Sequence, residues 1–131
     1  MEMNKSEKFF VNSNIFNFIY KITIYNSFLN FIDNFKNNSF DCIIETNVLH
    51  HIRNYENAIK EIRRVLKNKG YFYLMDISQY FFGLPFFKIL FPPESYITKN
   101  ILIQKLEEHN FKVEKSKGCF IFFIAAKKIQ K

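Results

Sequence analysis

The chain is poor in the residues that build small secreted scaffolds and phosphate-binding loops. Its 131 residues include two cysteines, three glycines, three prolines and no tryptophan. Two cysteines cannot form the disulfide framework of a small extracellular domain, and no signal-peptide pattern opens the sequence, so we expect a protein of the reducing cytoplasm. Gly70, Gly83 and Gly118 are too far apart to cradle a phosphate, which argues against P-loop and kinase activity. The glycine-flanked serine of α/β-hydrolases is also absent.

Long hydrophobic runs are missing as well. The longest apolar stretch, Tyr80–Pro93, has 14 residues and contains Pro85 and Lys88, whereas a membrane-spanning helix needs roughly 20 apolar residues. We therefore expect no transmembrane segment. This stretch could instead cover an apolar substrate pocket, lie on a membrane surface or fill the core, and the sequence does not choose among these uses.

The composition is that of a globular protein with an excess of positive charge. Hydrophobic residues make up 48% and charged residues 24% of the chain, which is typical of one folded domain. The net charge of +7 would favour nucleic acid or an anionic membrane as a partner. However, only three of the 19 cationic residues are arginine, and lysine is frequent together with Asn, Ile, Phe and Tyr, which A/T-rich codons encode. We interpret the charge as compositional bias, so nucleic acid is not the expected partner, and peripheral membrane contact stays open.

The middle of the chain predicts a strand, a helix and a second strand. Asp41–Thr46 and Tyr71–Ile77 are short apolar runs typical of strands buried on both faces. Between them, Asn57–Lys67 carries apolar residues at helical spacing, with Asn54 as the expected N-cap and Gly70 as the expected left-handed C-cap. Those apolar residues are Ala58, Ile59, Ile62, Val65 and Leu66. A helix that joins two such strands predicts a parallel pair with the helix packed across one face.

The rest of the chain divides into a patterned C-terminal part and an N-terminal part without a clear pattern. Thr98–Asn110 has one apolar side and predicts a second helix. Phe111–Ser116 alternates apolar and polar residues as a strand does, and Cys119–Lys128 predicts a longer buried strand after a turn at Gly118. Residues 1–33 are rich in Asn and Phe and have neither helical nor strand periodicity, so we separate them from a domain that spans residues 34–131.

Polar side chains follow the first of the two predicted parallel strands. In an open α/β sheet, ligands bind beyond the carboxyl ends of the strands. The loops Glu45–Ile52 and Asp76–Gln79 are therefore expected to meet at the site. Within the first loop, Glu45, Thr46 and Asn47 have side chains that could hydrogen-bond a polar ligand.

Two adjacent histidines lie in the same loop. His50 or His51 could act as an acid or base near neutral pH. The structural alternative is that one ring packs under the loop while the other faces solvent. We predict no metal site, because no second His or Cys lies at a ligand spacing from this pair, and we interpret Cys42 as a small core residue.

The stretch Asn34–Ser78 closely resembles the central part of class I S-adenosylmethionine-dependent methyltransferases of the type that acts on small molecules, quinones and lipids. That family has a Ser-Phe-Asp entry to a strand, a "vLHH" loop, a helix ending in "RvLKPGG" and a strand ending in Asp. The matching positions are Phe35, Ser39, Phe40, Asp41, Leu49, His50, His51, Arg64, Val65, Leu66, Lys67, Gly70 and Asp76. The segment "EEHNFKVEKS" resembles the family's later helix and sixth strand, so the resemblance extends from Asn34 to Lys128.

The resemblance implies an α/β fold: a partial Rossmann-like methyltransferase sheet, mostly parallel with an antiparallel last strand, and with flanking helices. The implied cofactor is S-adenosylmethionine. Glu45, Thr46 and Asn47 would flank its methionine part and sulfonium, and Asp33 is the carboxylate nearest to the family's adenine-side acidic residue. His50 and His51 would border the substrate, a small or lipid-like molecule. The family's glycine-rich cofactor loop and ribose-binding acidic residue have no counterpart in this sequence.

Three hypotheses about function follow. The first is S-adenosylmethionine-dependent methyl transfer, by a domain that is truncated relative to its family. The second is a non-catalytic relic or a partner subunit, and the third is a basic module that binds membranes or nucleic acid. Because the first parallel strand would expose its backbone edge, we predict that part of Phe9–Phe31, or a second chain, pairs along Cys42–Thr46.

Overall fold

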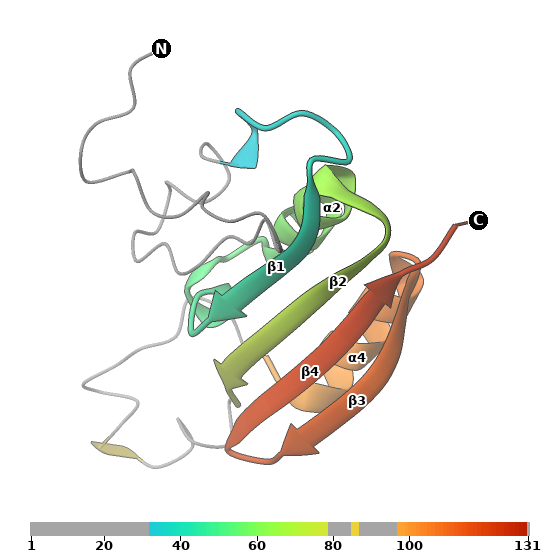
Figure 1. Ribbon diagram of the computed structural model, residues 1–131. Coiled ribbons are helices and arrows are strands. Elements are labelled where there is room, and N and C mark those ends of the chain that lie inside the picture. Colours follow the sequence, from blue (N-terminus) through green and yellow to red (C-terminus); the bar gives the residue numbers. More distant parts are fainter. Residues whose placement is uncertain (1–31, 79–84, 87–96, 131) are drawn as a thin grey trace.

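The structure, a computed structural model, describes residues 32–78, 85–86 and 97–130. In this part of the chain, four strands form one sheet in the order β1-β2-β4-β3 (Figure 1). The elements in chain order are β1 Phe40–Thr46, the 3-10 helix η1 Leu49–His51, α2 Tyr55–Val65, β2 Leu66–Ile77, α4 Lys99–Glu108, β3 Phe111–Gly118 and β4 Ile121–Lys128.

Strands β1 and β2 lie side by side and point the same way. Cys42 is opposite Tyr71 and Thr46 is opposite Met75, so the predicted parallel pair is confirmed. Strand β4 is antiparallel to both of its neighbours, β2 and β3. Three of the four strands therefore share one direction and the last runs against them, which confirms the predicted mostly parallel α/β sheet with an antiparallel last strand.

Helix α2 connects the parallel strands and begins where the sequence predicts. The side chain of Asn54 accepts a hydrogen bond from the backbone N–H of Asn57, which makes it the N-cap. The expectation that Gly70 forms a left-handed C-cap is wrong, because α2 ends at Val65 and the left-handed residue is Lys69, with φ of 65°. Gly70 is needed for space instead, since a Cβ there would lie 3.0 Å from the carbonyl oxygen of Asp41.

The core of the described structure lies on one face of the sheet. Helices α2 and α4 both pack against that face (Figure 1), where their buried residues meet alternate residues of the strands. The central members of this core are Ile59, Ile62, Leu102, Leu106, Phe72, Phe122 and Ile124. Helix α4 is capped by Thr98, whose hydroxyl accepts from the N–H of Ile101 at 3.2 Å.

The opposite face of the sheet is open, and we call it the open face. Tyr73, Ile121 and Phe123 are 41%, 50% and 52% exposed. The prediction of burial on both faces is therefore wrong for β2, and the predicted buried run of β4 is also partly exposed, because α2 and α4 occupy the same side. In β1, only Asp41 is exposed. Cys119, expected within a buried run, is exposed beside the turn, whereas Cys42 is buried as predicted.

Several expectations concern residues outside the described ranges. They include the irregular segment 1–33 apart from its last two residues, the pairing of Phe9–Phe31 along β1, and the uses proposed for Tyr80–Pro93 apart from Pro85 and Phe86. Within the described ranges, β1 is an edge strand of the sheet. Among the same residues, no helix has both the length and the apolar character needed to cross a bilayer.

Candidate functional site

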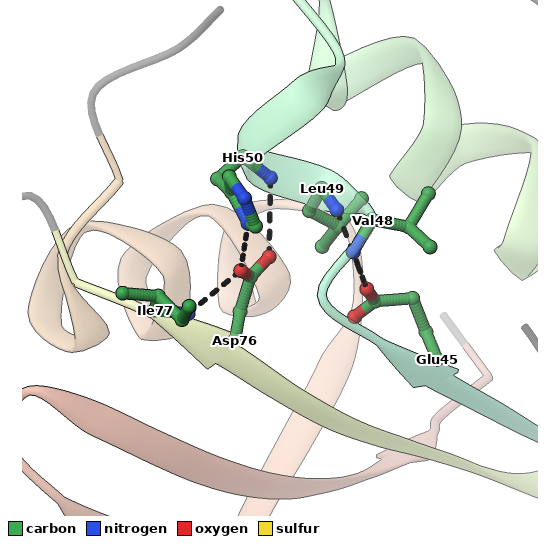
Figure 2. Close-up of polar contacts among 6 residues, drawn as sticks. All are labelled: Glu45, Val48, Leu49, His50, Asp76 and Ile77. Carbon is green, nitrogen blue, oxygen red and sulfur yellow. Dashed lines mark hydrogen bonds and ion pairs between the residues drawn. The ribbon is translucent and has the colours of Figure 1, made fainter. Parts of the chain in front are cut away.

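The carboxyl ends of β1 and β2 lie together and hold the polar residues of the site. The backbone N–H of Asn47 donates to the carbonyl oxygen of Met75 at 2.8 Å, so the hydrogen bonding between the two strands continues one residue past the end of β1. This register brings Glu45 and Asp76 to the same edge (Figure 2). The two predicted loops therefore meet, as expected for an open α/β sheet.

Glu45 is a buried carboxyl group at the end of β1. Its side chain is 3% exposed, and its Oε1 accepts hydrogen bonds from the backbone N–H groups of Val48 and Leu49 (Figure 2). Burial raises the pKa of Glu45 well above its usual value, and the nearby charge of Asp76 raises it further, while the two backbone hydrogen bonds lower it. Its other oxygen, Oε2, is buried and has no hydrogen-bond partner among the described residues.

Asp76 and His50 form a second buried polar contact at this edge. The backbone N–H of His50 donates to Oδ2 of Asp76 at 3.1 Å, and the ring Nδ1 of His50 contacts Oδ1 (Figure 2). The same Oδ1 accepts from the N–H of Ile77 at 2.7 Å. Since Asp76 is fully buried and His50 is 4% exposed, this contact anchors η1 to the end of β2 away from water.

The remaining candidates of the β1 loop lie next to these residues. Thr46 and Asn47 are half-buried, and Asn47 adopts a left-handed backbone conformation with φ of 57°. The side-chain oxygen of Asn47 is buried without a hydrogen-bond partner in the described part of the chain. The half-buried ring of His51 lies against that of His50, with ring centroids 3.9 Å apart.

The structure does not bring Asp33 to this cluster. Asp33 is exposed in the turn that precedes β1, and the neighbouring carbonyl of Ile32 accepts from the guanidinium of Arg64, near the end of α2. This turn and the arrowhead of β1 lie at opposite ends of the strand (Figure 1). Asp33 is thus placed at the other end of β1 from Glu45.

Asp76 was not among the site residues chosen from the sequence, although its position carried a signal. It falls at the end of the second predicted strand and matches the strand-terminal Asp of the resembled family. What the sequence did not show is that its carboxylate points to His50, which is 26 residues away. The described residues contain no cluster of three or more His, Cys, Asp or Glu side chains that could hold a metal ion.

A shallow hollow of about 350 Å³ lies on the open face beside these strand ends. Its wall includes Ile44 and Tyr73, together with Met75, Phe123 and Ala125. The hollow is mainly apolar, and the buried Glu45 and Asp76 carboxylates pack on the helix side of the sheet. An apolar group could occupy the hollow, but the hydrogen-bonding groups of the site lie at the strand ends.

Comparison with known families and sequences gives one family match and one short sequence match. The family model of a methyltransferase domain matches residues 14–74, and so includes part of the Asn- and Phe-rich segment. An uncharacterized protein of Methanocaldococcus jannaschii is 58% identical over 36 residues, which cover 28% of this chain and 16% of that protein.

Solved structures with the same fold are mostly methyltransferases. A SAM-dependent methyltransferase of Methanosarcina mazei matches with a TM-score of 0.59 and 20% identity over 75% of this chain and 63% of that chain. One from Thermotoga maritima matches with a TM-score of 0.62 and 17% identity, over 72% and 59%. The cyclase SpnF matches with a TM-score of 0.61 and 13% identity, over 75% and 53%. At these identities the likeness establishes the fold alone, and proteins with different chemistries share this fold. The chain spans between half and two thirds of the length of each of these structures.

Proposed function

We propose that the chain carries part of a class I S-adenosylmethionine-dependent methyltransferase domain, that it binds this cofactor at the carboxyl end of β1, and that it takes part in methyl transfer to a small-molecule or lipid-like acceptor. The observation that carries this proposal is the pair of buried acceptors at that position, Glu45 Oε2 and Asn47 Oδ1. A buried acceptor without a partner is costly in a folded protein, and a bound ligand that donates hydrogen bonds or carries positive charge removes that cost.

The chemistry of these residues fits the cofactor. S-adenosylmethionine carries an ammonium group and a sulfonium centre, and it supplies a methyl group that an acceptor atom attacks in line. Glu45, Thr46 and Asn47 would hold the ammonium and sulfonium side of the cofactor, since carboxylate, hydroxyl and amide oxygens accept hydrogen bonds and attract positive charge. The main contribution of the chain is then to align cofactor and acceptor.

A histidine would supply the base where the acceptor must lose a proton. His50 and His51 lie in η1, and Val48 and Leu49 separate them from the residues that would hold the cofactor. A positioned imidazole accelerates proton removal by roughly 10²- to 10⁴-fold. The apolar hollow on the open face is consistent with an acceptor that has a hydrophobic part.

A second candidate is a partner subunit whose sheet is completed by another chain. Two observations favour it: β1 is an edge strand in the described structure, and the open face carries exposed apolar side chains. An unpaired strand edge can pair with a strand of another chain, and an exposed apolar face can pack against another protein surface. In that case the complex, and not this chain alone, would carry the activity.

Calorimetric titration of the full chain with S-adenosylmethionine tests the proposal. We expect saturable heat, and weaker binding of S-adenosylhomocysteine, which lacks the sulfonium charge that Glu45 would attract. No detectable heat at millimolar cofactor would refute independent binding. Light scattering of the same sample would then test the partner-subunit candidate, which requires an assembly larger than one chain.

A further inference from the structure

Asp76 is a buried polar side chain at this edge, and the proposed function gives it no role. Its carboxylate receives three contacts (Figure 2): from the backbone N–H of His50, from the N–H of Ile77, and from the ring Nδ1 of His50. The first two come from backbone donors that cannot reverse their polarity. Both carboxylate oxygens therefore act as acceptors, and the arrangement is best satisfied when Nδ1 of His50 is also a donor.

We propose that Asp76 is a positioning residue that holds the His50 imidazole with its proton on Nδ1 and its lone pair on Nε2, so that His50 is the member of the histidine pair that acts as the base. The second half of this statement rests on the proposed function. The first half concerns the described residues alone and can be measured without cofactor or acceptor.

The tautomer determines which nitrogen can accept a proton. With Nδ1–H directed at Asp76, the lone pair of the neutral ring is on Nε2. Nε2 would then take the proton that an acceptor O–H or N–H loses, and the electron pair left on the acceptor atom would form the bond to the methyl carbon. The bond between that carbon and the sulfonium sulfur would break at the same time, and its electron pair would stay on sulfur as a neutral thioether. The resulting imidazolium keeps Nδ1–H against Asp76, whose negative charge stabilises it, as the aspartate does in Ser-His-Asp triads.

The ring orientation is also restricted by the surrounding structure. The backbone N–H and the ring of His50 are both held by one carboxylate, and the ring lies against that of His51. Because His50 is 4% exposed, water does not compete for the contact. A carboxylate that held only the backbone of η1 would leave the ring free to choose either tautomer.

Nitrogen-15 spectra of the histidine-labelled full chain at about pH 8, where an ordinary imidazole is neutral, test the first half. With signals assigned by His50→Gln, we expect the proton of His50 on Nδ1. Asp76→Asn should move the His50 proton wholly or partly to Nε2. The asparagine amide has one oxygen and one N–H₂ group, so its N–H₂ group would face one of the N–H groups that now donate to Asp76. The matched control is Asp41→Asn, which changes an exposed carboxylate in β1.

Two results would overturn this assignment: an unprotonated Nδ1 in the wild type, or an unchanged tautomer in folded Asp76→Asn protein. If Asp76→Asn does not fold, the wild-type spectrum decides by itself.

Adding S-adenosylmethionine to the labelled wild type tests the second half. We expect the ring signals of His50 to shift and those of His109, in the C-cap of α4, to stay. Binding without a change at His50 would overturn its role as base and leave the proposed function intact. No binding would overturn the proposed function, and Asp76 would then be only an anchor for η1.

Discussion

Replacing Glu45 with glutamine should weaken cofactor binding and stabilise the free protein. The change keeps the size of the side chain and an oxygen that can accept from Val48 and Leu49, as Oε1 does now. It removes the negative charge and puts an amide N–H₂ where Oε2 has no partner among the described residues. A purely structural glutamate would not couple these two effects.

The magnitude of the binding effect follows from the single interaction that is lost. One carboxylate oxygen is taken by the backbone of η1, which leaves Oε2 as the oxygen for a ligand. A hydrogen bond to a charged group contributes about 1.5–3 kcal/mol. Its loss corresponds to roughly 10- to 100-fold weaker binding. We therefore expect the dissociation constant for S-adenosylmethionine to rise by that factor in Glu45→Gln.

The effect on stability depends on pH, with a defined sign. The pKa of Glu45 is raised in the folded state by burial and by Asp76, above the ordinary 4.5 that applies to the unfolded chain. Above about pH 4.5 the folded state thus holds the proton more tightly than the unfolded state, and the wild type loses stability as pH rises toward the folded pKa. Glu45→Gln has no such titration, so its stability advantage should grow with pH from that point.

Calorimetry and urea unfolding measure the two effects. Titrations in buffers of different ionisation enthalpy should also show proton release on binding to the wild type and less to Glu45→Gln, because a cationic ligand favours the ionised carboxyl. Asp41→Asn is the matched control, since Asp41 is exposed in the same strand and paired with Lys67 at 2.9 Å. Equal affinity of Glu45→Gln and wild type for S-adenosylmethionine would refute the placement of the cofactor at Glu45.

Three further predictions concern the scaffold. Iodoacetamide should label exposed Cys119 much faster than Cys42, whose pKa is raised to about 11 by burial and by the nearby Asp41 charge; mass spectrometry of labelled peptides measures this. Gly118→Ala should cost at least about 1–3 kcal/mol in urea unfolding, because φ is +87° and a Cβ would lie 2.0 Å from the Ile121 carbonyl oxygen. Arg64→Lys should speed amide exchange in residues 35–38, since the guanidinium donates to two backbone carbonyls of the 32–37 turn; unchanged exchange would contradict this.

The strand–helix–strand unit was predictable because its signals are local. Asn54 precedes the helix with a side chain that can cap it, and the apolar residues of α2 recur at a helical period. Two apolar runs joined by one helix leave a parallel crossover as the main solution. The end of the helix was harder to predict from the sequence. Lys69 adopts the left-handed conformation expected of Gly70, and Gly70 is required there for its small size.

The candidate site was predictable in position but not in its contacts. Strand ends in a parallel pair must meet, which placed Glu45 and the histidines at one edge. The contact of Asp76 with His50 depends on the direction of two side chains 26 residues apart. The raised pKa of Glu45 depends on how completely the folded chain excludes water from it and on the nearby charge of Asp76. Neither the contact of Asp76 with His50 nor the burial of Glu45 can be predicted from a local sequence pattern.

The sequence by itself determined the order of the elements, the parallel pairing of β1 with β2 and the edge at which polar residues gather, because period, caps and chain connectivity act over short distances. Only the tertiary structure decided that α2 and α4 share one face, that the other face is open, and that Glu45 and Asp76 are buried side by side. Those outcomes depend on packing between distant segments, where burial changes the energy of a charge and the direction in which a side chain can bond.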